Sequence, residues 1–191
     1  MTMQIENVIF LDVDGVLNRL DARGNVVVTL QAPGMEGAAV VELNIVGALD
    51  HVLRQTPWIK LVASSTWRFS EPKQGYVVET VEDFCRYTRL GADLFHTDWR
   101  TELYDTGANR VLEVEDWLRR HREVTRSATI EDNFRDQFKE LPQCKFVHVD
   151  WREGLTFKKL EKLMLHFRIR VMPDLSVRSA GGPLPTDIIN P

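Results

Sequence analysis

The chain has 191 residues, of which 43% are hydrophobic and 27% charged, and its formal net charge is −4. This composition is ordinary for a globular protein of one domain with a substantial core, and the negative charge argues against broad nonspecific binding to nucleic acid. No apolar run approaches the ~20 residues that span a bilayer, no signal-peptide pattern opens the chain and two cysteines are too few for a disulfide framework, so we expect a cytoplasmic protein without a membrane partner.

Strand and helix patterns alternate along the chain, which favours an α/β fold with a mostly parallel central sheet. The predicted elements are, in chain order, a strand at 4–11, a helix from Asn44 as N-cap to about Leu53, a strand at 58–63, a helix at 108–121, strands at 127–130 and 145–149, and a helix at 156–167.

The first connection, residues 19–41, reads as a loop or hairpin with a strand-like run at 26–30 after the Gly24-Asn25 turn signal. At the other end, residues 173–191 contain four prolines and two adjacent glycines. We expect this last segment to be a loosely ordered tail behind one domain that covers residues 1–172.

Residues 69–107 are rich in Gly, Pro, Asp and Thr and predict an irregular insert. Within this insert, residues 80–90 have a helical pattern and residues 92–95 could form a short strand.

The most informative segment is VIFLDVDGVLN at 8–18. Apolar residues end the first predicted strand, Asp12 and Asp14 follow two residues apart, and Gly15 allows a sharp turn. Because alternate side chains of an extended chain point the same way, both carboxylates reach one spot, where they need a cation or a proton between them. Hard oxygen ligands of this kind suit Mg²⁺, which also binds phosphate oxygens. The segment therefore predicts a magnesium site, with a plain Asp-Gly turn as the alternative.

Two later strands also end in polar residues. The predicted strand at 58–63 is followed by Ser64 and Ser65, whose hydroxyls can donate to a phosphoryl oxygen, although a turn is the alternative explanation. The strand at 127–130 is followed by Glu131 and Asp132, a second acidic pair that can supply a metal ligand, although such residues can also begin a helix.

The segment at 8–18 resembles motif I of the haloacid dehalogenase (HAD) superfamily, whose pattern is hhhDxDGh, and the resemblance extends over about residues 5–167. It implies a Rossmann-like three-layer sandwich with a minimal cap, in which residues 19–41 are the flap beside the site. It also implies a Mg²⁺-dependent phosphatase with Asp12 as the nucleophile and Asp14 as the acid/base.

The same resemblance assigns the polar strand ends. Ser64, or Ser65 as second choice, would bind phosphate as motif II. Asp132 would join Asp12 and Asp14 in holding the metal as motif IV. Asp-Asp is usual at this motif. Glu131 departs from that pattern, and we place it behind the metal ligands.

A HAD site also requires a cation, normally a lysine, near a helix N-terminus. No lysine lies between Lys73 and Lys139. Arg110 opens the helix before the motif IV strand and is therefore the expected catalytic and phosphate-binding cation. Arg100 is its rival, and a solvated surface position is the alternative for Arg110.

A narrower likeness lies in SSTWR at 64–68 and TGANRVLEVEDWLRRH at 106–121. These segments are similar to small-cap HAD domains of the bacterial Swiss army knife RNA-repair-like group, with the patterns S/T-x-W-R and R-x-x-E-h-x-x-W-L. The likeness suggests a nucleotide or a nucleic-acid end as substrate, contacted by Trp67 and Arg68, with Trp99 as a further candidate, although tryptophans at element ends usually pack in a core or rim.

Two other functions stay open at this point. One is a phosphatase for free nucleotides or small metabolites. The other is a non-catalytic module that binds metal or phosphate in a repair complex. The intact pair of Asp12 and Asp14 argues against the module, because a binding role needs no proton donor.

Overall fold

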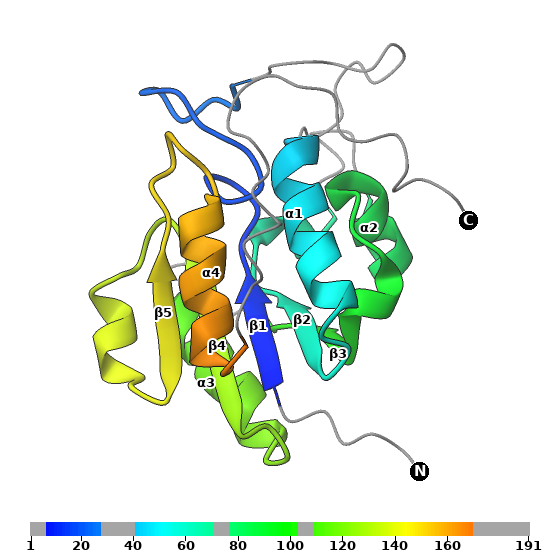
Figure 1. Ribbon diagram of the computed structural model, residues 1–191, viewed down its shortest axis with the longest axis vertical. Helices are drawn as coiled ribbons and strands as arrows, with labels where there is room; N and C mark the ends of the chain where they lie inside the picture. Colours follow the sequence, from blue (N-terminus) through cyan, green and yellow to red (C-terminus); the bar gives the residue numbers. More distant parts are fainter. Residues whose placement is uncertain (1–6, 28–40, 71–76, 103–108, 170–191) are drawn as a thin grey trace.

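The computed structural model describes residues 7–27, 41–70, 77–102 and 109–169. Its centre is a sheet of five strands in the order β3-β2-β1-β4-β5, in which all neighbouring strands are parallel (Figure 1). The strands are β1 Asn7–Leu11, β2 Ile59–Ala63, β3 Phe95–Arg100, β4 Arg126–Glu131 and β5 Cys144–His148. The predicted α/β fold with a parallel sheet is confirmed.

Helices pack on both faces of the sheet. The α-helices are α1 Leu43–Arg54, α2 Val81–Thr88, α3 Arg110–Arg120 and α4 Phe157–His166, and the short 3₁₀ helices are η1 Thr66–Arg68, η3 Ala92–Leu94 and η4 Gln137–Glu140. Residues of α1, α2 and α4 share one hydrophobic cluster, and residues of α3 and η4 share another (Figure 1). The two clusters on the two faces make the predicted three-layer sandwich.

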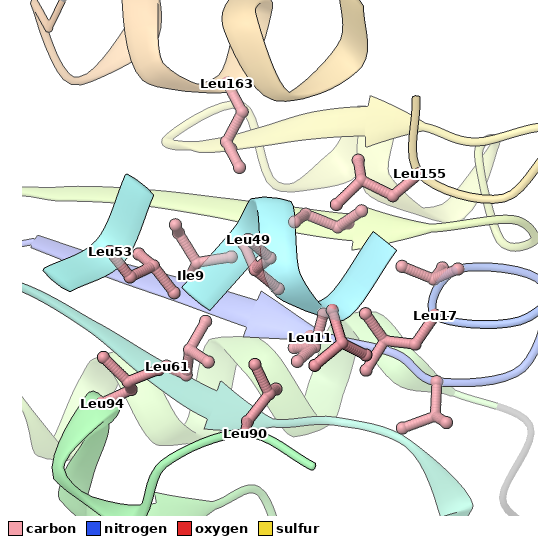
Figure 2. Close-up of a cluster of buried hydrophobic side chains, with 14 of the residues drawn as sticks. Ile9, Leu11, Leu17, Leu49, Leu53, Leu61, Leu90, Leu94, Leu155 and Leu163 are labelled. Atoms are coloured by element: carbon pink, nitrogen blue, oxygen red, sulfur yellow. The ribbon is translucent and has the colours of Figure 1, made fainter. Parts of the chain in front are cut away.

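The central strand β1 contributes to both clusters because its side chains alternate between the faces. Ile9 and Leu11 lie among leucines of α1 and α4 (Figure 2). On the other face Phe10 packs edge-on against Trp117 of α3, with ring centroids 5.3 Å apart. Full burial of one such side chain stabilises the fold by about 1.5–3 kcal/mol. The strand that leads to the two aspartates is therefore anchored from both sides.

The register of the sheet determines which polar residues meet. Leu11 at the end of β1 pairs with Ala63 of β2 and with Ile130 of β4. The three strands thus end level with one another at the carboxyl edge of the sheet. The residues that follow or close them are neighbours at that edge, namely Asp12, Ser64 and Glu131.

The prediction that Asn44 caps α1 is wrong. The helix begins at Leu43, so Asn44 lies within its first turn, and Glu42 occupies the N-cap position. Glu42 does not cap the helix with its side chain, because its carboxylate accepts a hydrogen bond of 2.6 Å from Arg19 Nε. A tertiary contact here overrides the local capping preference.

The predicted strand at 92–95 is also wrong in its bounds. Residues 92–94 form η3, and β3 runs from Phe95 to Arg100. As an edge strand, β3 is buried at its first two residues and only partly covered beyond them, so its sequence lacks the apolar run of an inner strand.

Other predictions in the irregular stretches fare differently. The helix expected at 80–90 is confirmed as α2, where Thr80 and Asp83 form a capping box. In the expected flap, Leu20 and Val26 form an antiparallel bridge, while residues 28–40 and the tail at 173–191 lie outside the described residues. None of the helices in the described ranges is long and apolar enough to cross a membrane.

Candidate active site

The turn after β1 holds Asp12 and Asp14 against the end of β4. The backbone N–H of Asp12 donates to Ile130 O at 3.2 Å, which extends the β1–β4 pairing by one residue. Gly15 has φ +71° and donates from its N–H to Asn18 Oδ1 at 2.8 Å. A Cβ on Gly15 would lie only 2.4 Å from Asp132 Oδ2, so the glycine allows the turn to approach that carboxylate closely.

Three buried carboxyl groups meet at this point. One oxygen each of Asp12, Glu131 and Asp132 lies within 4.8 Å of the other two. Burial raises the pKa of all three groups, and for Glu131, where the charge of Asp12 adds to burial, the pKa lies well above its ordinary value. The interaction between the two side chains opposes the rise in the pKa of Asp12 and adds to the rise in the pKa of Glu131.

This cluster of three carboxyl groups fits a magnesium ion. All of its donors are hard carboxylate oxygens, which Mg²⁺ prefers as ligands. A divalent cation would neutralise part of the negative charge of these carboxylates and so lower their raised pKa values.

Asp14, the second aspartate of the turn, accepts hydrogen bonds from two neutral donors. Asn18 Nδ2 donates to its Oδ1 at 3.1 Å, and Trp67 Nε1 donates to its Oδ2 at 2.8 Å. Burial raises the pKa of Asp14, and the two donors oppose this rise. Trp67, which the sequence suggested as a substrate contact, is 93% buried with its N–H on Asp14.

The two serines after β2 differ in what they contact. Ser65 Oγ accepts a hydrogen bond from Trp67 N at 3.3 Å and so caps η1. Ser64 is fully buried, and its hydroxyl has no hydrogen-bond partner among the described residues. Since an unpaired buried hydroxyl is costly, Ser64 is the serine with a free donor for a ligand.

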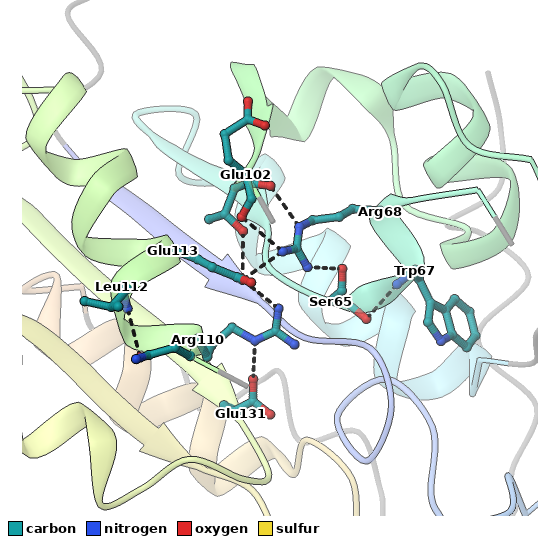
Figure 3. A network of polar contacts seen from close by, with 10 residues as sticks. Ser65, Trp67, Arg68, Glu102, Arg110, Leu112, Glu113 and Glu131 are labelled. Atoms are coloured by element: carbon teal, nitrogen blue, oxygen red, sulfur yellow. Dashed lines mark hydrogen bonds and ion pairs between the residues drawn. The ribbon is translucent and has the colours of Figure 1, made fainter. Parts of the chain in front are cut away.

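Arg110 is the arginine that the structure places next to the acidic group (Figure 3). It is the first residue of α3, its side chain is 6% exposed, and its Nε lies 3.5 Å from Glu131 Oε2. Burial raises the pKa of Asp12, and the positive charge of Arg110 lowers it. Arg100 instead donates to Arg68 O at 3.0 Å and lies over the ring of Trp99.

Arg68 is fully buried. Its Nε donates to Thr101 O at 2.9 Å, its Nη1 donates to Ser65 O, and its Nη2 pairs with Glu113 Oε2 at 2.7 Å (Figure 3). Burial lowers the pKa of Arg68 to about 10. All these contacts lie within the chain, so the guanidinium connects the loop after β2 to the end of β3 and to α3.

The structure therefore brings together nearly all the residues that the sequence singled out, and adds two contacts. The pairing of Trp67 with Asp14 spans 53 positions and has no local signal. Glu113 stood in the R-x-x-E pattern without being assigned to the site, and the i,i+3 spacing on one helix face was the signal for its pairing with Arg110.

A second group of metal-binding residue types, His96, His121 and Glu123, lies by the start of β3 and the end of α3. Asp98 N donates to His96 Nδ1 at 3.0 Å, so a neutral His96 carries its proton on Nε2 and has no free lone pair for a metal. His121 lies between Asp98 and Glu123, at 2.9 and 2.8 Å. We regard this group as a satisfied hydrogen-bond network.

Comparisons with known proteins agree with this architecture. The family described as "HAD domain in Swiss Army Knife RNA repair proteins" matches residues 8–160, which supports a HAD-type, phosphatase-like function at the level of the superfamily. No curated protein matches the chain in sequence.

Two solved structures of the HAD domain of effector protein Lem4 from Legionella pneumophila, one of them an inactive mutant, are similar in fold. Each is 12% identical, the matches cover 84% and 85% of this chain and 93% and 95% of the Lem4 chains, and the TM-scores are 0.50 and 0.51. Taken with the five-stranded parallel sheet and the residues at its carboxyl edge, the family match shows that the chain belongs to the HAD domains of Swiss Army Knife RNA repair proteins.

Proposed function

We propose that this protein is a Mg²⁺-dependent phosphatase that hydrolyses phosphate monoesters through an aspartyl-phosphate intermediate, with nucleotides or nucleic-acid ends as substrates. The observation that supports the proposal best is the surroundings of Asp12. Its buried carboxylate lies in the acidic group, beside the charge of Arg110 and one strand away from the unpaired hydroxyl of Ser64. A nucleophile, a cation and a hydrogen-bond donor for a phosphoryl group thus share one edge of the sheet.

In the proposed reaction, a carboxylate oxygen of Asp12 attacks phosphorus while the bond from phosphorus to the ester oxygen breaks. Asp14 gives its proton to the departing oxygen, then accepts a proton from the water that attacks the aspartyl phosphate, which releases inorganic phosphate and regenerates Asp12. Ser64 and Arg110 bind the equatorial oxygens, where charge lies in the transition state.

Bound Mg²⁺ would neutralise charge between the carboxylate and the phosphate. We assign it to the carboxylates of Asp12 and Asp132 and to the backbone carbonyl of Asp14, with Glu131 behind them. We further propose that Trp67 orients the Asp14 carboxylate through its N–H and that Arg68 stabilises the loops of the site.

The test is a substrate panel of nucleotides, 3′- and 5′-phosphorylated oligonucleotides and sugar phosphates, assayed with Mg²⁺ for release of inorganic phosphate. We expect wild-type turnover and none for Asp12→Asn, because an amide of the same shape is a poor nucleophile. Circular dichroism shows whether the variant is folded. Beryllofluoride should bind the wild type only with Mg²⁺ present and should not bind Asp12→Asn.

The results separate the candidate functions. Turnover that is fastest on sugar phosphates would replace the nucleic-acid substrate by a small metabolite. Binding of Mg²⁺ and phosphate without turnover of any substrate would indicate a non-catalytic module. Full activity in a folded Asp12→Asn protein would refute the aspartyl-phosphate mechanism.

A further inference from the structure

A buried chain of charges that alternates in sign leads to Arg110, one of the proposed catalytic residues. Arg68, Glu113 and Arg110 have side-chain exposures of 0%, 1% and 6%. Glu113 Oε2 accepts hydrogen bonds from Arg68 Nη2 at 2.7 Å and from Arg110 Nη1 at 3.1 Å (Figure 3). One carboxylate oxygen therefore bridges two arginines that come from η1 and α3.

Arg68 is the fixed end of this chain. Two backbone carbonyls, Ser65 O and Thr101 O, accept from its guanidinium, and both belong to segments that directly follow strands of the sheet. A planar guanidinium held at two of its nitrogens has little freedom left. The place of Glu113 Oε2 is consequently set by the end of the sheet as well as by α3.

Arg110 is the end of the chain that needs to be held. It stands at the first helical position of α3, and the structure orients its flexible side chain through the bond to Glu113 and the ion pair with Glu131. The contact with Glu131 is longer, at 3.5 Å, and is no hydrogen bond. Two buried arginines this close also repel each other, and the negative charge of Glu113 compensates that repulsion.

We propose that Glu113 is a positioning residue: by bridging Arg110 to the fixed Arg68, it holds the Arg110 guanidinium at the edge where Asp12 and a phosphoryl group meet. This inference rests on the function proposed above. Glu113 touches no reacting atom in this arrangement and acts only through Arg110.

A double-mutant cycle tests this dependence, because two residues that act through one contact are not additive. We expect Glu113→Gln to lower kcat/KM by about 10- to 100-fold, the range for groups that orient a catalytic centre. In an Arg110→Ala background the same change should lower it by less than about 2-fold. Equal effects in both backgrounds would overturn the proposal, since they would show that Glu113 only stabilises the fold. Glu115→Gln, an exposed site on the same helix, is the matched control and should leave activity unchanged.

The loss of the buried charge beside Arg68 could prevent Glu113→Gln from folding, so Glu113→Asp forms a second cycle. Aspartate keeps the charge and withdraws the oxygens by one methylene, so the Glu113→Asp variant should fold. Its activity should lie between those of the wild type and Glu113→Gln, and it should show the same non-additivity with Arg110→Ala. Additive behaviour of a folded Glu113→Asp would equally overturn the proposal.

Failure of the proposed function gives a different result. If the wild type turns over no substrate, the same variants are compared by calorimetry for their affinity for inorganic phosphate in the presence of Mg²⁺. Glu113→Asp should bind phosphate more weakly than the wild type, and the same change should have no effect on phosphate affinity in the Arg110→Ala background. This result would support positioning without catalysis. Equal affinities for wild type and Glu113→Asp would refute it.

Discussion

Arg110 Nε lies 3.5 Å from Glu131 Oε2, and this pair joins the start of α3 to the end of β4. The pair brings a permanent positive charge to the buried acidic group, where three carboxyl groups stand together. One divalent cation cannot balance these carboxylates and a phosphate dianion, so a fixed cation is needed when substrate is bound.

Substitution of this cation should reduce turnover strongly. We expect Arg110→Ala to lower kcat by about 10²–10³-fold, the scale for loss of a donor that stabilises transition-state charge. Arg110→Lys should recover part of the loss, but the planar fork is missing. Steady-state kinetics measures both. Arg100→Ala is the matched control, because Arg100 donates to Arg68 O and lies over Trp99, and no ion pair among the described residues joins it to the acidic group. A larger loss for Arg100→Ala would transfer the role to Arg100.

The acidic group should make activity depend on Mg²⁺. EDTA should inactivate the enzyme and Mg²⁺ should restore it, with Ca²⁺ a poor substitute because its shell is larger and looser. We expect Asp132→Ala to raise the Mg²⁺ concentration for half-maximal activity by about 100-fold or more, and Glu131→Ala by about 10-fold. A metal titration of both variants gives the comparison. If Glu131→Ala has the larger effect, the assignments of the two residues are reversed.

The raised pKa of Glu131 predicts how the stability of the metal-free protein varies with pH. The folded state holds the Glu131 proton more tightly than the unfolded chain does, so the stabilisation is complete below about pH 4.3 and is lost as pH rises through the higher folded pKa. In EDTA the melting temperature of the wild type should therefore fall with rising pH more steeply than that of Glu131→Gln.

Thermal melts at several pH values between 5 and about 8 measure this difference. Glu140→Gln, at an exposed position, is the control and should follow the wild type. Parallel curves for wild type and Glu131→Gln would show that the proton lies elsewhere.

Gly15 offers a test of the close packing between the motif I turn and β4. Gly15→Ala combines a positive φ with a Cβ placed 2.4 Å from Asp132 Oδ2, so it should lower the free energy of unfolding by about 1–3 kcal/mol and also weaken Mg²⁺ binding. Gly24 has a positive φ, but a Cβ there would meet no atom within 4 Å. Gly24→Ala should therefore lower the free energy of unfolding through backbone strain without weakening Mg²⁺ binding. Gly47→Ala, in α1 with open space around it, should stabilise the protein by about 0.5–1 kcal/mol. Equal Mg²⁺ affinity in Gly15→Ala and the wild type would contradict the packing argument.

The sequence predicts best where the signal is local. Asp12, Ser64 and Glu131 each end or follow an apolar strand, and parallel pairing brings such strand ends to one edge, so the structure gathers them as expected. The predicted N-cap of α1 is wrong, because Glu42 occupies that position and binds Arg19. The predicted start of β3 is wrong, because an edge strand needs no continuous apolar run. The contact of Trp67 with Asp14 depends on how η1 packs against the first turn, which no local pattern encodes.

The central position of β1 in the sheet also affects how a newly made chain acquires this site. β2 follows β1 after a single helix, whereas β4 is made only after α1, β2, α2, β3 and α3. Until β4 is added, β1 presents an unpaired edge, the N–H of Asp12 lacks its acceptor at Ile130, and only one of the three carboxyl groups is in place. During synthesis the acidic group therefore forms late, after residue 132 has left the ribosome, and a chain released before that point carries an open strand edge that favours aggregation.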